Sequence, residues 1–313
     1  MPLKPRIARR KVILAGAAAL AAGGAYEIQK KPVLQRISVR QAGLVGTLFL
    51  PPNPSALPAV VSLTGAMGGL FEAPAEALAQ AGFAVLALAT HNTEGRPATL
   101  RLQPVEYVLE AVEWLRQWVQ PARGRVALRG WSRGGELALL AASLSPAVNG
   151  VIAYAPRTYV GREQNKPNNF GDPTAAAAFT WRGEPLDGVP LPEAMRINRT
   201  SPSLEDLHGI AVERIAGPIM FVSGSADTGL AGTTADFSCD RAMRRLELFK
   251  SPWRHTHDHY PDAGHDIAGP PPYAGQAEGG GTIAGNANAI AASWPRAIDF
   301  LRSLESPEPF FRE

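Results

Sequence analysis

The stretch Gly124-Arg-Val-Ala-Leu-Arg-Gly-Trp-Ser-Arg-Gly-Gly-Glu-Leu-Ala-Leu-Leu-Ala-Ala-Ser143 decides the fold of this 313-residue chain. It opens with a short alternating segment, Arg125–Arg129, which predicts a β-strand. A sharp turn at Gly130-Trp-Ser-Arg-Gly134 follows, and the Ala/Leu-rich run after it predicts a buried helix. A G-x-S-x-G sequence between a strand and a helix is typical of a nucleophile elbow.

The elbow motif places a serine where a nucleophile can be activated. A Cβ at position 130 or 134 would crowd the adjoining strand or helix, and glycine has none. Ser132 would sit in a strained turn at a helix N-terminus, where the free N–H groups favour negative charge. We therefore predict Ser132 as the nucleophile and the N–H of Arg133 as one donor of an oxyanion hole. A plain strand-to-helix turn with a serine N-cap is the alternative interpretation.

The composition is that of an ordinary globular protein, with 45% apolar and 19% charged residues. The net charge is +3, and much of this excess lies in an N-terminal cluster: Lys4, Arg6, Arg9, Arg10 and Lys11. No basic stripe with interleaved aromatic residues occurs elsewhere in the sequence, so we expect no nucleic-acid partner. The single cysteine, Cys239, excludes an intrachain disulfide and a cysteine-based zinc knuckle.

Residues 1–32 resemble a targeting segment rather than part of a fold. The basic cluster precedes an apolar run, Val12–Ala25, which is shorter than the roughly 20 residues that a spanning helix needs. Arg9-Arg10 is similar to a twin-arginine export signal, and small residues near Gly24-Ala25 would suit cleavage. We predict a signal peptide or an uncleaved membrane anchor, and hence a periplasmic or membrane-tethered protein. A frayed N-terminal helix on a cytoplasmic protein is the alternative.

Apolar runs alternate with helical patterns along most of the remaining chain. Continuous apolar segments such as Ala59–Thr64 predict buried parallel strands, and amphipathic segments such as Pro104–Val119 predict helices between them. This order predicts the α/β class, with a mostly parallel central sheet flanked by helices. Together with the elbow motif, it predicts one α/β-hydrolase domain over residues 33–313. The last helix is predicted over Ala284–Leu304, with an interruption at Pro295.

Residues 156–210 break this alternation, because they are rich in Pro, Gly, Asn and Arg. A long irregular stretch inside a compact domain is commonly functional. The stretch follows the carboxyl end of an expected strand, which is where open α/β sheets bind ligands. We therefore predict a lid-like insertion over the site.

A glycine-rich turn, Gly65-Ala-Met-Gly-Gly69, follows the buried strand at residues 59–64. Such a turn lets backbone N–H groups approach a ligand, and we predict the N–H of Ala66 as the second oxyanion donor. A phosphate-binding loop is disfavoured, because the turn lacks the G-x-x-x-x-G-K-[ST] pattern.

Two further residues complete a candidate triad with Ser132. Asp227 closes the turn after the apolar strand Pro218–Ser223, and His265 lies in a tight turn after Ala263-Gly264. Serine, acid and histidine occur in the order that α/β hydrolases require. His265 would act as the general base, and Asp227 would fix its tautomer and stabilise the imidazolium.

Other residues compete for these roles. Four carboxylates are alternatives for the acid: Asp236, Asp240, Asp262 and Asp266. Two histidines lie in expected loops without a tight turn: His91 and His208. Three histidines occur at alternate positions, and a metal-binding site is one interpretation of this pattern: His255, His257 and His259. An exposed strand face is the favoured reading of that alternation, because no carboxylate pair lies nearby at motif spacing, so we expect no metal or other cofactor.

Several stretches together resemble a known family. They are Gly43–Pro52, Gly65–Glu72, Glu94–Leu115, Gly130–Glu136, Phe179–Leu186, Gly224–Asp227, Tyr260–Asp266 and Gly280–Asn288. Over residues 35–304 the chain is similar to the C-terminal α/β-hydrolase domain of the bile acid-CoA:amino acid N-acyltransferase / acyl-CoA thioesterase family, with dienelactone hydrolases as neighbours. The resemblance implies Ser132 as nucleophile, Asp227 as acid and His265 as base.

The predicted function is hydrolysis of small-molecule acyl thioesters or carboxylic esters through an acyl-enzyme intermediate. Family members that transfer acyl groups to amino acids carry cysteine at the nucleophile position, so serine here is similar to the hydrolysing members. Two features depart from the family. At most two strands precede the hydrolase domain, where larger members have a β-sandwich, and an export signal argues against CoA, a cytosolic cofactor. Acyl transfer to an amino acid amine and a non-catalytic binding scaffold are the alternatives.

Overall fold

The computed structural model describes residues 32–163, 175–188, 209–229, 235–272 and 277–306. Residue contacts divide the chain into Met1–Lys31 and Pro32–Glu313, and the sheet and helices belong to the second unit. The segment predicted as a signal peptide or anchor lies almost wholly outside the described residues. Within the described part, no helix is long and apolar enough to cross a membrane.

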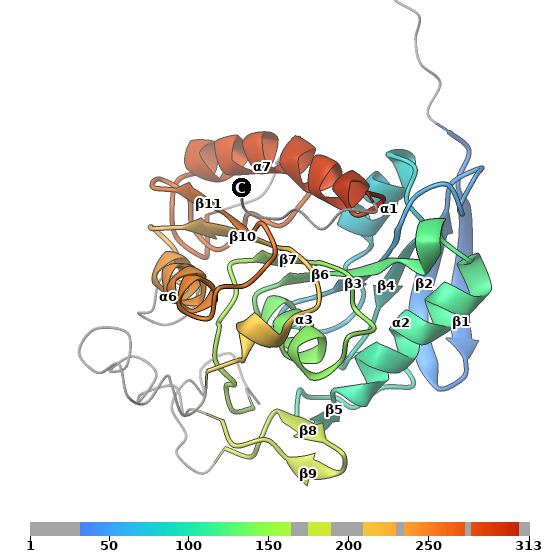
Figure 1. The fold of residues 1–313 in the computed structure, drawn as a ribbon, viewed down its shortest axis with the longest axis horizontal. Helices are drawn as coiled ribbons and strands as arrows, with labels where there is room; N and C mark the ends of the chain where they lie inside the picture. Colours follow the sequence, from blue (N-terminus) through green and yellow to red (C-terminus); the bar gives the residue numbers. More distant parts are fainter. Residues whose placement is uncertain (1–31, 164–174, 189–208, 230–234, 273–276, 307–313) are drawn as a thin grey trace, which may run out of the picture. The chain divides into compact units, whose positions relative to one another are not determined.

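An eight-stranded sheet forms the centre of the second unit, in the order β1-β2-β4-β3-β6-β7-β10-β11 (Figure 1). Its strands are β1 (Gln35–Gln41), β2 (Leu44–Leu50), β3 (Ala59–Leu63), β4 (Val85–Leu88), β6 (Val126–Trp131), β7 (Val151–Tyr154), β10 (Ile219–Gly224) and β11 (Thr256–Tyr260). β2 pairs antiparallel with β1 and β4, and the remaining neighbours are parallel. The sheet is therefore mostly parallel, as predicted, with an antiparallel edge.

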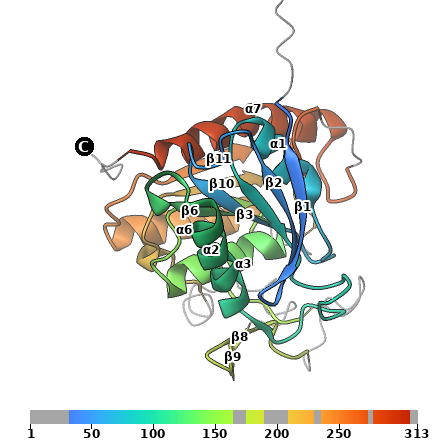
Figure 2. The same cartoon turned by 90° about the vertical axis from the view of Figure 1, so that its right-hand side faces the viewer.

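Helices cover both faces of this sheet (Figure 2). On one face lie α1 (Glu72–Gln80) and α7 (Ile283–Ser303), and on the other lie α2 (Glu106–Val119), α3 (Arg133–Leu144) and α6 (Ala235–Leu248). Successive strand residues alternate between the two apolar clusters, because strand side chains point to opposite faces. Val60 packs in the cluster with α1, whereas Val61 packs in the cluster with α2. The α/β class predicted from the sequence is confirmed.

The predicted interruption of the last helix at Pro295 is wrong. The structure has one helix, α7, that runs through this proline. A proline removes one backbone N–H from the helical ladder. Tertiary packing outweighs that loss, since a buried apolar face holds the helix on both sides of the proline. This face is formed by Ala289, Ile290, Trp294, Ala297 and Leu301.

The insertion predicted at residues 156–210 is described in part, at 156–163, 175–188 and 209–210. It contributes β8 (Phe179–Trp181) and β9 (Glu184–Pro185), which join β5 (Gln103–Pro104) in a separate three-stranded sheet. Two short 3₁₀ helices complete the described elements: η1 (Ala122–Gly124) and η2 (Val212–Arg214). The start of the insertion is fixed by α3, because Glu136 Oε1 accepts the N–H of Gly161 at 2.8 Å. A lid role stays a prediction.

Candidate active site

The turn predicted as a nucleophile elbow lies between β6 and α3, where the sequence places it. Ser132 lies between the last residue of β6 and the first residue of α3, with φ 55° and ψ −120°. A positive φ is uncommon for a residue with a Cβ, so this conformation is strained and must be held by its surroundings. A Cβ on Gly130 would overlap the carbonyl of Gly134, and a Cβ on Gly134 would overlap that of Thr64. The two glycines are therefore required by close backbone packing.

Asp227 and His265 are joined by a buried hydrogen bond. His265 Nδ1 and Asp227 Oδ2 are 2.9 Å apart, and the two side chains are 9% and 0% exposed. Asp227 follows β10 and His265 follows β11, and these parallel strands are neighbours, so their carboxyl ends meet at one edge of the sheet. The second carboxylate oxygen of Asp227 accepts the N–H of Gly229 at 2.8 Å. The carboxylate is thus fixed on both oxygens.

Of the four carboxylates that compete with Asp227 by sequence, Asp262 is exposed and the other three have other partners. Asp266 accepts the N–H of Gly279 at 3.0 Å, and Asp236 accepts the hydroxyl of Ser225 at 2.8 Å. Asp240 lies beside β11 with 61% of its side chain exposed. Among the described carboxylates, Asp227 is the one that contacts His265.

Trp131 links the elbow to the histidine loop. Its Nε1 donates to the carbonyl of His265 at 2.9 Å, and the two ring centroids are 5.5 Å apart. Trp131 directly precedes Ser132, so this contact brings the serine turn and the histidine turn to the same place. The N–H of His265 also donates to the carbonyl of Gly279 at 3.0 Å. Sequence analysis missed Trp131 and Gly279, although the run Gly279–Gly281 was a signal of close backbone packing.

The predicted oxyanion loop lies against the elbow. A Cβ built on Gly65 would be 3.3 Å from Cβ of Ser132, so the turn that carries Ala66 begins beside the serine. The N–H of Arg133 is in the first turn of α3, where helical N–H groups lack intrahelical acceptors. Both predicted donors therefore belong to backbone that adjoins Ser132, and their role as an oxyanion hole stays a prediction.

The side chain of Arg133 does not point toward the predicted oxyanion hole but forms contacts with Glu136 and with the insertion. Its guanidinium is 1% exposed and lies 2.5 Å from the Glu136 carboxylate, which is fully buried. Burial lowers the pKa of Arg133 and raises the pKa of Glu136, because each charged form loses its hydration. The guanidinium also donates to the carbonyls of Gly161 and Arg162 at 3.2 Å. Arg133 thus anchors the insertion through its side chain, and its backbone remains beside Ser132.

Two of the three alternating histidines, His257 and His259, lie on β11, and all three form hydrogen bonds through their side chains. His257 binds Ser223 at 2.6 Å through Nε2 and Asp240 at 2.9 Å through Nδ1. His259 Nε2 lies 2.5 Å from the hydroxyl of Ser225. Among the described residues, no group of three or more His, Cys, Asp or Glu side chains could hold a metal ion. His208, the other histidine that the sequence leaves unassigned, lies outside the described residues.

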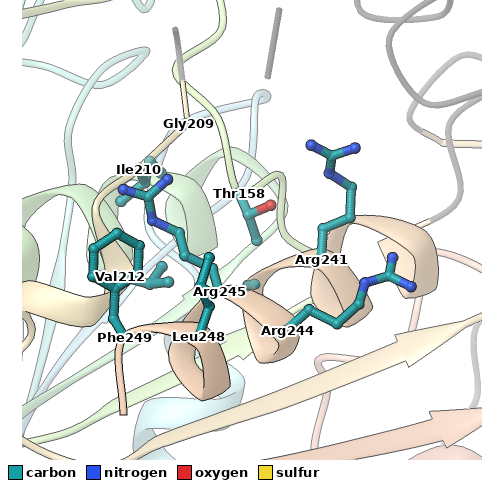
Figure 3. A pocket seen from close by; sticks show the side chains of 10 residues that line it. Thr158, Gly209, Ile210, Val212, Arg241, Arg244, Arg245, Leu248 and Phe249 are labelled. Atoms are coloured by element: carbon teal, nitrogen blue, oxygen red, sulfur yellow. The ribbon is translucent and has the colours of Figure 1, made fainter. Parts of the chain in front are cut away.

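A cavity of about 570 Å³ lies along α6 (Figure 3). Three arginines of α6 line it together with apolar side chains: Arg241, Arg244, Arg245, Ile210, Val212, Leu248 and Phe249. Arg245 Nε is paired with Glu213 at 2.5 Å. None of Ser132, Asp227 and His265 lines this cavity.

Two curated relatives match most of the chain. Acyl-coenzyme A thioesterase 2, mitochondrial, of Mus musculus is 31% identical over 281 residues, which cover 85% of this chain and 57% of the relative. Acyl-coenzyme A thioesterase 1 of Rattus norvegicus is 30% identical over 299 residues, which cover 90% and 66%. The chain therefore spans 57% to 66% of the length of these relatives.

Solved structures show the same fold. A Klebsiella pneumoniae subsp. pneumoniae protein named as a dienelactone hydrolase has a TM-score of 0.57 at 16% identity, covering 87% of this chain and 99% of that one. A dienelactone hydrolase-like promiscuous phosphotriesterase from metagenomic libraries has a TM-score of 0.55 at 15% identity, covering 88% and 99%. The predicted α/β-hydrolase fold is thereby confirmed. Residues 103–305 match the family model described as "BAAT / Acyl-CoA thioester hydrolase C terminal", and the chain belongs to this family.

Proposed function

We propose that this chain is a serine hydrolase that cleaves acyl thioesters or carboxylic esters through an acyl-enzyme intermediate. The observation that carries the proposal is the buried hydrogen bond between Asp227 and His265, 2.9 Å long, beside the strained elbow that bears Ser132. Family membership and the names of the relatives, acyl-coenzyme A thioesterases, support thioesters among the substrates. Serine at the nucleophile position supports hydrolysis over transfer to an amine.

The first half of the reaction acylates Ser132. Its Oγ attacks the acyl carbonyl and its proton passes to Nε2 of His265, while Nδ1–H of the same ring donates to the Asp227 carboxylate. The carbonyl electron pair moves onto oxygen, and the N–H groups of Ala66 and Arg133 donate to that oxyanion. Collapse of the tetrahedral intermediate expels the thiolate or alkoxide, which takes the proton from Nε2.

The second half repeats these steps with water. His265 removes a proton from water, the hydroxide attacks the acyl-enzyme, and the second tetrahedral intermediate forms in the same oxyanion hole. Its collapse releases the carboxylic acid and returns the proton to Ser132 Oγ. The Gly229 N–H holds Asp227 throughout, so the carboxylate keeps His265 in one tautomer over both halves.

The test is covalent labelling of the full chain with a fluorophosphonate, which transfers its phosphonyl group to an activated serine and releases fluoride. We expect one adduct by intact mass on the wild-type protein and none on Ser132→Ala. Absence of labelling in a protein shown to be folded would refute the proposal and favour a non-catalytic scaffold.

A second assay separates hydrolysis from acyl transfer and identifies the leaving group. An acyl-CoA and a p-nitrophenyl ester of the same chain length are compared, with and without glycine or taurine. We expect the free acid as the product in every reaction. An amide product that replaces the acid would instead identify an acyltransferase.

A further inference from the structure

The loop that contains Ala66 is pressed against the segment that follows β4. Gly68 and Gly69 have φ of +66° and +73°, in the region that favours glycine. A Cβ on Gly68 would lie 2.6 Å from the carbonyl oxygen of His91 and 2.8 Å from Cβ of Asn92. The glycines of this turn therefore allow two backbones to touch, in addition to any approach to a ligand.

Three hydrogen bonds join the two segments. His91 Nε2 lies 2.9 Å from the carbonyl oxygen of Ala66, and Asn92 Nδ2 donates to the carbonyl of Met67 at 2.7 Å. The N–H of Gly69 donates to the carbonyl of His91 at 2.8 Å. Because each peptide unit is planar, bonds to two successive carbonyls fix the course of the chain that leaves Ala66.

The hydrogen bonds of His91 select one tautomer of the neutral ring. A carbonyl can only accept, so Nε2 carries the hydrogen that reaches Ala66. Nδ1 then accepts from the hydroxyl of Thr90, at 3.0 Å. Burial lowers the pKa of His91, and the cations of Arg133 and Arg96 lower it further. The neutral ring with Nε2–H satisfies both neighbours.

The segment after β4 is itself anchored. Arg96 Nε donates to the carbonyl of Thr90 at 3.2 Å, and its guanidinium lies 3.6 Å from the ring centroid of Tyr107. The N–H of Asn92 donates to the carbonyl of Pro97 at 2.7 Å. Tyr107 in turn donates its hydroxyl to the carbonyl of Ala89 at 2.9 Å. His91 and Asn92 therefore project from a fixed backbone, which a positioning role requires.

We propose that His91 and Asn92 position residues 65–69 so that the N–H of Ala66 is aimed at the oxyanion of the transition state. The inference rests on the proposed function, and it assigns positioning residues that act through backbone rather than on the substrate. Preorganised donors stabilise charge without reorganising during the reaction, so loosening the loop should lower kcat and leave ground-state binding in place.

The experiment compares His91→Phe, His91→Gln and Asn92→Asp in the full chain, with a p-nitrophenyl ester as substrate. Phenylalanine fills the buried site without a donor, whereas the glutamine amide supplies an N–H near the position of Nε2. We expect His91→Phe to lower kcat about 10- to 100-fold with KM nearly unchanged, and His91→Gln to restore most of it. Asn92→Asp, which tolerates the positive φ but removes the donor, should behave like His91→Phe.

A transition-state mimic separates positioning from general damage. A trifluoromethyl ketone forms a hemiketal oxyanion on Ser132, so its inhibition constant should rise in parallel with the fall in kcat/KM. The carboxylate product carries no such oxyanion, and its inhibition constant should stay within about twofold of the wild-type value. Unchanged kcat in folded His91→Phe, or a loss that His91→Gln does not restore, would overturn the positioning role. Failure of the proposed function is distinguishable, because the wild-type protein would then show no hydrolysis and no labelling at Ser132.

Discussion

The orientation of the His265 ring depends on close packing against Gly229 and Gly279 as well as on hydrogen bonding. A Cβ on Gly229 would overlap the imidazole ring, and a Cβ on Gly279 would lie 2.5 Å from Cβ of His265. The Gly229 N–H binds Asp227, so the same residue fixes the Asp227 carboxylate and confines the His265 imidazole. The backbone at the two glycines therefore restricts the position of the His265 imidazole.

Adding one methyl group at Gly229 should impair catalysis selectively. We expect Gly229→Ala to lower kcat/KM roughly 10- to 100-fold, because it displaces the His265 ring from the geometry that proton transfer needs. The matched control is Gly269→Ala, since a Cβ there meets nothing within 4 Å. Steady-state kinetics and thermal unfolding of both variants provide the measurement. Equal activity of the two alanine variants would contradict this view of the site.

His91 also predicts a pH dependence of stability. Its pKa is lowered in the folded state by burial, so the unfolded chain binds the proton more readily. Stability should therefore fall as the pH drops below about 7, until the folded-state pKa is passed. Urea unfolding at pH 7.5 and pH 5.5 should show a smaller loss for His91→Gln than for the wild type. A parallel loss in the two proteins would refute the contribution of His91.

At the scale of elements, a buried ion pair within α3 holds the start of the insertion through hydrogen bonds to Gly161 and Arg162. Arg133 and Glu136 both bind Gly161, and both side chains are excluded from water. An ion pair of this kind is weak evidence for stability, because desolvation offsets the attraction, but breaking one side leaves a buried charge. The pair therefore acts as a positional constraint on the chain after β7.

Removing one partner should show this asymmetry. Glu136→Gln leaves the Arg133 guanidinium buried without a counter-charge and should lower the free energy of unfolding by about 3–5 kcal/mol. Replacing both residues, with Arg133→Met and Glu136→Leu, should recover part of that loss. Urea unfolding gives the free energies of unfolding of the single and the double variant, and their difference tests this expectation. A double variant less stable than Glu136→Gln would contradict the argument.

Elements that depend on local patterns were predictable from the sequence, and contacts between distant segments were not. The strands and helices beside Ser132 follow from apolar periodicity, and the elbow is a contiguous motif. The predicted interruption at Pro295 is wrong, because tertiary packing of α7 outweighs the local tendency of proline to break a helix. The sequence does not favour His91 as a site residue, because no tight turn surrounds it. Its proposed positioning role depends on a contact with Ala66, which is 25 positions away. Trp131 and His265 are 134 positions apart, and no local signal connects them.

At the scale of the whole molecule, cellular location decides which leaving group the site encounters. The match to acyl-CoA thioesterases favours a CoA thioester, whereas the basic and apolar N-terminal residues favour export from the compartment that holds CoA. The proposed mechanism can serve either substrate, because its steps at Ser132 and His265 are the same for a thiolate and an alkoxide. Location is therefore the observation that separates a thioesterase role from an esterase role.

We propose that Arg9 and Arg10 direct the full chain through a twin-arginine export route. Expressed in a bacterium with that route, the wild-type protein should fractionate with the periplasm or membrane, and Arg9→Lys with Arg10→Lys should remain cytoplasmic, because the paired guanidinium groups form the signal. The matched control, Lys30→Arg with Lys31→Arg, keeps the charge beyond the apolar run and should be exported like the wild type. Intact mass of the exported form distinguishes a peptide cleaved near Gly24-Ala25 from a retained anchor. A wild-type protein found intact in the cytoplasm beside its double-lysine variant would contradict the export proposal.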